Sequence, residues 1–255
     1  MQVRIWLFVV LNLLLSLPTA YAQAPIKIMT IGDSITAAPW YRRALKNDLT
    51  AAGYRTDFVG TQFGANPEGG FRDGEHEGYP GCKIGDVTQK LTDPKTGALA
   101  KFQPDFILVL LGTNDIGQGQ LNGAIERLES LLKMLIKTQP KAKIILGEIP
   151  SILPHAFSGY ANFSGDVSLY NQQIQQLALR LKLPVAQIYR YLPPTKDYIG
   201  DGVHPSGYGV GATNDGYKRL GDAWFAAMRP LLPRQAPVEN PTLPRGEVVL
   251  GSDNH

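Results

Sequence analysis

Short apolar runs alternate with stretches of helical periodicity along most of this chain, and this alternation constrains its fold more than any other feature. Five runs have the length and composition of strands, and they span residues 26–31, 55–60, 106–111, 143–149 and 185–189. The run at 106–111 is apolar throughout, as expected for a strand in a sheet that is covered on both faces. The pattern therefore predicts a central sheet between layers of helices.

The stretches between these runs predict the helices. Leucine and isoleucine recur at spacings of three and four from Leu121 to Leu135, which is one apolar stripe of a helix. Further helices are predicted over 39–52, 167–182 and 214–232. Strands with intervening helices predict an α/β chain, a three-layer α/β/α sandwich around a mostly parallel, five-stranded sheet. Residues 61–83 are rich in glycine and polar side chains, which predicts a long functional loop.

The N-terminus has the pattern of a secretory signal peptide. Arg4 precedes the almost wholly apolar segment 5–17, and Ala20 and Ala22 are small residues at the −3 and −1 positions of a cleavage site. The apolar segment is too short to span a bilayer, so no stable membrane anchor is expected after cleavage. We predict a signal peptide over 1–22 and export to a bacterial periplasm or to the medium.

The rest of the chain divides into a domain and a tail. One globular domain is predicted over 23–232, which is long enough to bury a core without a disulfide. From residue 233 the composition changes, because four prolines fall within twelve residues and the end is polar. Residues 233–255 are therefore predicted to be a poorly ordered tail or an extended strap.

Composition excludes several classes of function. The chain has 255 residues and a formal net charge of +3, with no dense block of lysine and arginine, so a nucleic-acid partner is not expected. Cys82 is the only cysteine, so no internal disulfide can form. The four histidines lack the spacing of metal ligands, and neither a metal site nor a cofactor is expected.

Five residues suited to acyl transfer follow the predicted strands. Ser34 stands in a glycine-initiated turn after the first run, and Asn114 follows the third. Asp201 and His204 follow the fifth run, and Gly81 lies in the loop after the second. Open α/β sheets bind ligands beyond the carboxyl ends of their strands, so these residues are expected to meet at one rim.

Together these residues provide the parts of a serine hydrolase. Ser34 is the candidate nucleophile, His204 the base that takes its proton, and Asp201 the group that orients His204. The candidate oxyanion donors are the N–H groups of Ser34 and Gly81 and the side-chain amide of Asn114. Four of these residues also have a structural interpretation, as a helix cap for Ser34 and as turn residues for Asp201, Gly81 and Asn114. The occurrence of all five in one chain favours catalysis.

On these residues the chain resembles the SGNH, or GDSL, hydrolase superfamily. Ser34, Gly81, Asn114 and His204 match its four blocks in order, and Asp201 matches the acid of its Asp-x-x-His block. The resemblance covers essentially the whole predicted domain. It implies a flavodoxin-like sandwich with strand order 2-1-3-4-5 and a mechanism that needs no metal.

A narrower resemblance is to the exported carbohydrate esterases, which include acetylxylan esterases, and it rests on residues 57–60 and 76–81. Two departures limit what it implies about the substrate. Members often carry tryptophan after the glycine of the second block, where this chain has Cys82. A glycine-rich stretch, Ser206–Thr213, separates the His-Pro pair from the last helix and is expected to reshape one wall of the site.

Four further residues have competing interpretations. His76 and His155 are predicted to line the substrate cleft, and a surface histidine is the alternative for each. Asp33 and Asp115 flank two of the candidate catalytic positions. For both aspartates, turn and cap roles are favoured over a functional carboxylate pair.

Three functions are compatible with these residues. The first is an exported serine esterase that removes short acyl groups, acetyl above all, from carbohydrate through an acyl-serine intermediate. The second keeps this chemistry but acts on a lysophospholipid, a thioester or an aryl ester. The third is a carbohydrate-binding protein on an inactive hydrolase fold, which the intact set of Ser34, Asp201 and His204 disfavours. The expected partner is an acylated carbohydrate or another small ester, and the oligomeric state is left open.

Overall fold

The computed structural model describes residues 24–65, 70–95, 97–154, 156–157, 163–207 and 215–234. The predicted signal peptide, His155, most of the stretch Ser206–Thr213 and most of the predicted tail lie outside these residues. Within the described ranges, no helix combines the length and the hydrophobicity needed to cross a membrane.

The strands form one sheet that is parallel except at one edge. In sequence order they are β1 (Ile26–Gly32), β2 (Thr56–Phe58), β3 (Gln62–Phe63), β4 (Glu75–Gly78), β5 (Phe106–Leu110), β6 (Lys143–Gly147) and β7 (Val185–Ala186). The sheet order is β3-β4-β1-β5-β6-β7, and β2 also pairs with β1. Only β3 and β4 pair in antiparallel fashion among the described strands. The predicted order 2-1-3-4-5 is therefore confirmed as β2-β1-β5-β6-β7, with β3 and β4 added at the edge.

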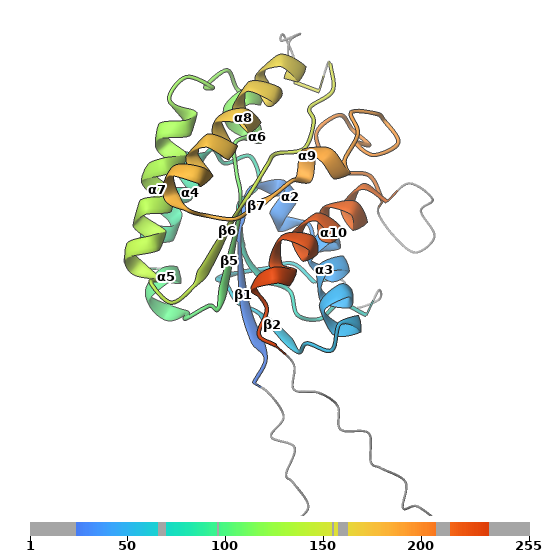
Figure 1. Cartoon of the computed structure of the whole chain (residues 1–255). Helices are drawn as coiled ribbons and strands as arrows, with labels where there is room; N and C mark the ends of the chain where they lie inside the picture. Colours follow the sequence, from blue (N-terminus) through green and yellow to red (C-terminus); the bar gives the residue numbers. More distant parts are fainter. Residues whose placement is uncertain are drawn as a thin grey trace, which may run out of the picture.

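Helices cover both faces of the sheet, which confirms the three-layer sandwich (Figure 1). On one face α3 packs against α10, and on the other α7 packs against α4 and α8. The helices are α2 (Ser34–Ala37), α3 (Trp40–Ala51), α4 (Ile84–Thr92), α5 (Ala98–Lys101), α6 (Thr113–Gly117), α7 (Ala124–Thr138), α8 (Phe163–Leu181), α9 (Ile188–Tyr191), α10 (Gly216–Met228) and the 3-10 turn η1 (Arg229–Leu231).

The region 61–83, predicted to be a loop, contains β3 and β4, so that prediction was wrong. β2 pairs with only the first part of β1, at Ile26–Ile28, and β4 pairs with its end, at Ile31 and Gly32. The buried Glu77 of β4 is satisfied by Thr61 and Tyr79, whose N–H and hydroxyl groups donate to its carboxylate. A polar strand of this kind has no apolar pattern in the sequence because its partners come from tertiary contacts.

The last predicted strand, 185–189, is shorter than expected. Only Val185 and Ala186 pair with β6, at Leu146 and Gly147. Beyond this point the side chain of Glu148 accepts a hydrogen bond from the backbone N–H of Tyr189, 3.2 Å away. The chain then turns into the short helix α9, which places the segment leading to Asp201 and His204 above the sheet (Figure 1).

The core forms where α10 meets the sheet and α3. Trp224 of α10 is fully buried, and a Cβ at Gly147 would lie 2.8 Å from its ring. A Cβ at Gly221 would lie 2.7 Å from the Cβ of Ala44, so glycine permits the close approach of α10 to α3. Burial of one large apolar side chain contributes about 1.5–3 kcal/mol. The helix that follows the His204 segment is thus firmly packed on the sheet.

Candidate active site

Ser34 lies where β1 ends and α2 begins. A Cβ at Gly32 would lie 2.1 Å from the Oγ1 atom of Thr36, so only glycine fits at this tight exit from the strand. Asp33 caps α2, because its Oδ1 atom accepts a hydrogen bond from the N–H of Ile35 at 2.9 Å. This confirms the predicted cap role of Asp33. The turn presents Ser34 as the first residue of α2, with its side chain partly accessible.

The structure brings Ser34, His204 and Asp201 into one hydrogen-bonded chain, although Ser34 and His204 are 170 positions apart in the sequence. The Oγ atom of Ser34 lies 2.8 Å from Nε2 of His204. Nδ1 of His204 lies 2.7 Å from Oδ2 of Asp201. This is the geometry that an acid–base–nucleophile relay requires.

The hydrogen bonds around Asp201 fix the tautomer of His204. Burial acts to raise the pKa of the Asp201 carboxyl, but hydrogen bonds from the His204 N–H, the His204 imidazole and the Val203 N–H outweigh it and lower the pKa below its ordinary value. An ionised carboxylate can only accept, so Nδ1 of His204 carries the proton. Nε2 is then left with a lone pair for the Ser34 hydroxyl.

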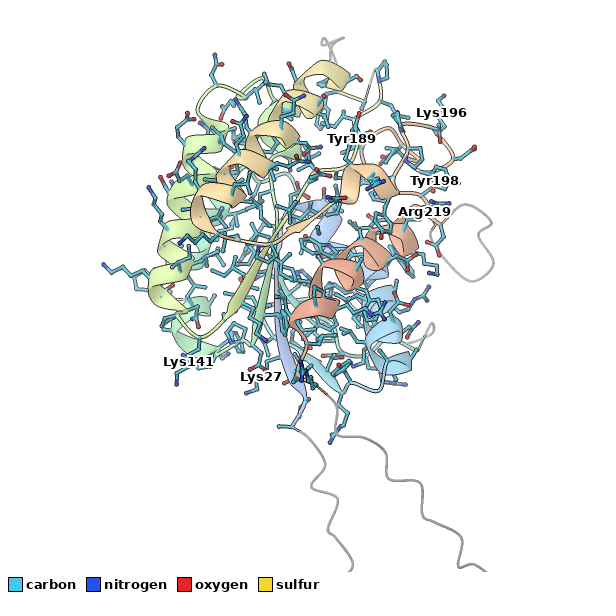
Figure 2. All side chains as sticks on the ribbon, viewed as in Figure 1. Lys27, Lys141, Tyr189, Lys196, Tyr198 and Arg219 are labelled. Carbon is cyan, nitrogen blue, oxygen red and sulfur yellow. The ribbon has the colours of Figure 1, made fainter. Side chains whose placement is uncertain are left out.

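Three contacts hold the segment that carries His204: one within the segment and two with neighbouring parts of the fold. Within it, Ile199 pairs with Pro205 across an isolated bridge. From the β6 side, the N–H of Leu153 donates to the carbonyl of Gly202 at 2.8 Å. From α10, the guanidinium of Arg219 stacks 4.4 Å from the ring centre of Tyr198, and the two side chains lie together in Figure 2. His204 therefore sits on a braced loop and not on a free one.

The three predicted oxyanion donors come from adjacent loops. The loop after β4 carries Gly81, whose φ of 74° favours glycine. The side-chain amide of Asn114, at the start of α6, donates to the carbonyl of Cys82 at 3.1 Å, which ties these two loops together. The second N–H of that amide has no acceptor among the residues that the structure describes, since an amide nitrogen carries two. Within the described residues, the backbone N–H groups of Ser34 and Gly81 also have no protein acceptor.

Two supporting residues, Asp115 and Gln118, have hydrogen-bond partners that the sequence does not reveal. Asp115 is buried and accepts hydrogen bonds from the N–H of Ile84 and from Arg127, the latter at 2.9 Å. It therefore fastens the start of α4 to the Asn114 turn, a cap role made across the fold. Gln118 donates to the carbonyl of Gly81 at 3.1 Å, which orients the peptide beside the Gly81 N–H.

Asp33 also places a buried carboxyl next to the catalytic set. Burial raises its pKa to about 6, against smaller opposing effects from the Ile35 N–H and from His204. Its Oδ2 atom is buried without a hydrogen-bond partner among the described residues. Ionisation of Asp33 in the folded protein is therefore costly.

This cost predicts a pH-dependent effect of Asp33→Asn on stability. A carboxyl whose pKa is higher in the folded state than in the unfolded state stabilises the fold below its unfolded pKa. That stabilisation is lost as pH rises towards the folded pKa. The variant, which cannot ionise, should gain on the order of 2 kcal/mol relative to the wild type between about pH 4.5 and about pH 7. Urea unfolding across this range measures the gain. Asp197→Asn, at an exposed carboxyl, is the matched control, and a difference independent of pH would contradict the prediction.

The structure does not place either of the two predicted cleft histidines at a substrate cleft. His76 is 3% exposed in β4, and its Nδ1 accepts a hydrogen bond from the N–H of Gly78 at 2.9 Å. Burial, together with the nearby Arg42, lowers its pKa to about 3, so the ring is neutral. This buried position disagrees with a substrate-lining role for His76. His155 lies outside the described residues.

Cys82 does not compete with Ser34 as a nucleophile. Burial raises the pKa of its thiol, which leaves it protonated near neutral pH. Among the described residues, no three histidine, cysteine or acidic side chains gather in an arrangement that would hold a metal ion.

Comparisons with known proteins show the family of this chain. The chain matches the model of the GDSL-like lipase/acylhydrolase family over residues 30–212. A multidomain esterase from Ruminococcus flavefaciens is 33% identical over 240 residues, which cover 84% of this chain. The chain spans only 30% of the length of that protein.

Two solved structures share the fold. A family 3 carbohydrate esterase from Clostridium thermocellum is 23% identical, with a TM-score of 0.65, and the match covers 81% of this chain and 96% of the other. A family 3 carbohydrate esterase from Talaromyces cellulolyticus is 25% identical, with a TM-score of 0.63, and the match covers 81% of this chain and 97% of the other.

Proposed function

This chain belongs to the GDSL-like lipase/acylhydrolase family, and on that basis we propose that it is an exported serine esterase that removes short acyl groups, acetyl above all, from carbohydrate. The observation that carries the catalytic part is the 2.8 Å contact between Ser34 Oγ and His204 Nε2, with Asp201 behind the imidazole. It supplies a nucleophile with a base already in hydrogen-bond contact.

The proposed reaction proceeds in two displacements. Ser34 Oγ attacks the carbonyl carbon of the ester while its proton passes to Nε2 of His204. The oxyanion that forms accepts hydrogen bonds from the Ser34 and Gly81 N–H groups and from the Asn114 amide. When the carbon–oxygen bond to the alcohol breaks, His204 gives its proton to the leaving alcohol oxygen, and the acyl group stays on Ser34.

Water completes the cycle by the same route. His204 takes one proton from a water molecule, whose oxygen attacks the acyl carbon and forms a second oxyanion. The bond to Ser34 Oγ then breaks, Oγ recovers the proton from His204, and the carboxylic acid leaves. Throughout, the Asp201 carboxylate holds the imidazole and stabilises its transient positive charge.

The proposed substrate rests on the relatives and the proposed location on the N-terminal segment. Two similar structures are of carbohydrate esterases by name, and one is of an acetyl esterase. The basic and apolar segment at residues 4–22 supports export by way of a cleaved signal peptide. An exported enzyme of this class would meet polymeric glycans outside the cell.

Acyl-chain profiling tests this proposal. With p-nitrophenyl acetate, butyrate and octanoate as substrates, we expect kcat/KM to fall by at least about tenfold from acetate to octanoate. Acetate release from acetylated xylan should accompany this preference. A preference for octanoate would instead favour the lysophospholipid or thioester alternative. Binding to xylan without turnover of any ester would support the non-catalytic alternative.

A further inference from the structure

A polar groove begins beside the loop that carries Gly81 and follows the outer face of α4. It has a volume of about 450 Å³ and is lined by Cys82, Asp86, Gln89, Lys90 and Asp93. Asp86, Gln89 and Lys90 share one side of α4, while Ile84, Val87 and Leu91 are buried on the opposite side. Cys82 and Asp93 continue this surface beyond the two ends of the helix. The face is therefore a continuous surface and not a chance grouping of side chains.

The groove is joined to the catalytic site through covalent neighbours. Cys82 lies at the end of the groove nearest the start of α4. It directly follows Gly81, and its carbonyl accepts the hydrogen bond from Asn114. From there the nine residues of α4 extend the surface by about 13 Å. A ligand held by its ester at Ser34 and leaving the site past Gly81 would run along this face.

The chemistry of the lining suits a saccharide. Four of the five lining residues are polar. The carboxylates of Asp86 and Asp93 already accept hydrogen bonds from the N–H groups of Lys83 and Lys95, and each has further acceptor capacity. The Lys90 ammonium donates, and the Gln89 amide both donates and accepts. Sugar hydroxyls need donors and acceptors side by side, which an acyl chain does not. The Lys90 ammonium also lies 5.2 Å from the ring centre of Tyr79. Two carboxylates beside one ammonium disfavour an anionic glycan.

We propose that the face of α4 formed by Cys82, Asp86, Gln89, Lys90 and Asp93 binds the backbone of a neutral saccharide chain whose acyl ester is cleaved at Ser34. This inference rests on the proposed function and deepens it, because it assigns the specificity for long substrates to residues outside the catalytic set. Its signature is a dependence on chain length that disappears when the face is altered.

The test compares acetylated xylobiose, acetylated xylotetraose and p-nitrophenyl acetate as substrates of the full-length enzyme. For the wild type, kcat/KM should be higher for the tetraose than for the biose. Gln89→Ala, which removes an exposed amide and keeps a good helix former, should lower kcat/KM for the tetraose about three- to tenfold through KM. Addition of Asp86→Asn, which retains an acceptor for the Lys83 N–H, should lower it further.

Gln176→Ala is the matched control, since Gln176 is an exposed mid-helix glutamine of α8 outside the groove. It should leave all three substrates unchanged, and Gln89→Ala should leave p-nitrophenyl acetate unchanged. Unaltered tetraose kinetics in both groove variants would overturn the groove assignment alone, as would an equal loss on all three substrates. A wild type that cleaves p-nitrophenyl acetate but neither saccharide would overturn the proposed function and the groove with it.

Discussion

Ser34→Ala is expected to lower kcat for p-nitrophenyl acetate by about 10⁵-fold or more. The variant lacks the Oγ atom that lies 2.8 Å from Nε2 of His204, so no acyl intermediate can form. The oxyanion donors are left in place, and a residual rate above the uncatalysed reaction is therefore expected. Steady-state kinetics with p-nitrophenyl acetate measure the loss.

The fold should tolerate this change. Among the described residues Ser34 makes one side-chain hydrogen bond, and the α2 cap depends on Asp33, so thermal unfolding should shift little. Ser130→Ala is a matched control, because Ser130 is an exposed serine of α7 whose hydroxyl bonds only within its helix. Retention of full activity by Ser34→Ala would show that the nucleophile lies elsewhere.

His204→Ala is expected to cost about as much, roughly 10⁴- to 10⁶-fold in kcat. Without the imidazole, the Ser34 hydroxyl has no base, and the leaving alcohol has no acid. Because the two residues act as one unit, the double variant Ser34→Ala/His204→Ala should be no slower than either single variant. Losses that multiply in the double variant would mean that the residues act independently, which would contradict the relay of Ser34, His204 and Asp201.

The sandwich and the meeting of Ser34 with His204 could be predicted from sequence because both follow strong local patterns. Apolar runs such as 106–111 become buried strands whichever neighbours they have, and all of Phe106–Leu110 is buried in β5. Ser34, Asn114 and His204 follow such runs in short motifs, and parallel strands bring their carboxyl ends to one edge. The hydrogen bond across 170 positions is the outcome of that topology.

The parts that could not be predicted depend on tertiary partners. β4 reads as a loop because Glu75, His76 and Glu77 are polar, yet Glu77 is buried against Thr61 and Tyr79. His76 has the composition of a site residue, but its pairing with Gly78 turns it inward. Packing, and not residue type, decided both cases.

The hydrogen bonds that hold the loops of Gly81 and Asn114 also depend on tertiary partners. The link from Asp115 to Ile84 spans 31 positions, and the link from Gln118 to Gly81 spans 37 positions. No local pattern in the sequence marks either pair. The saccharide groove on α4 likewise becomes visible only once the start of that helix is fastened beside Asn114.

The most direct test of the central claim is the site of covalent labelling by a fluorophosphonate, which phosphonylates an activated serine. Mass spectrometry of the digested wild type should find a single adduct on the peptide that contains Ser34. The Ser34→Ala variant should carry none. An adduct at another residue, or an active wild type that is never labelled, would contradict the assignment of Ser34 as the nucleophile.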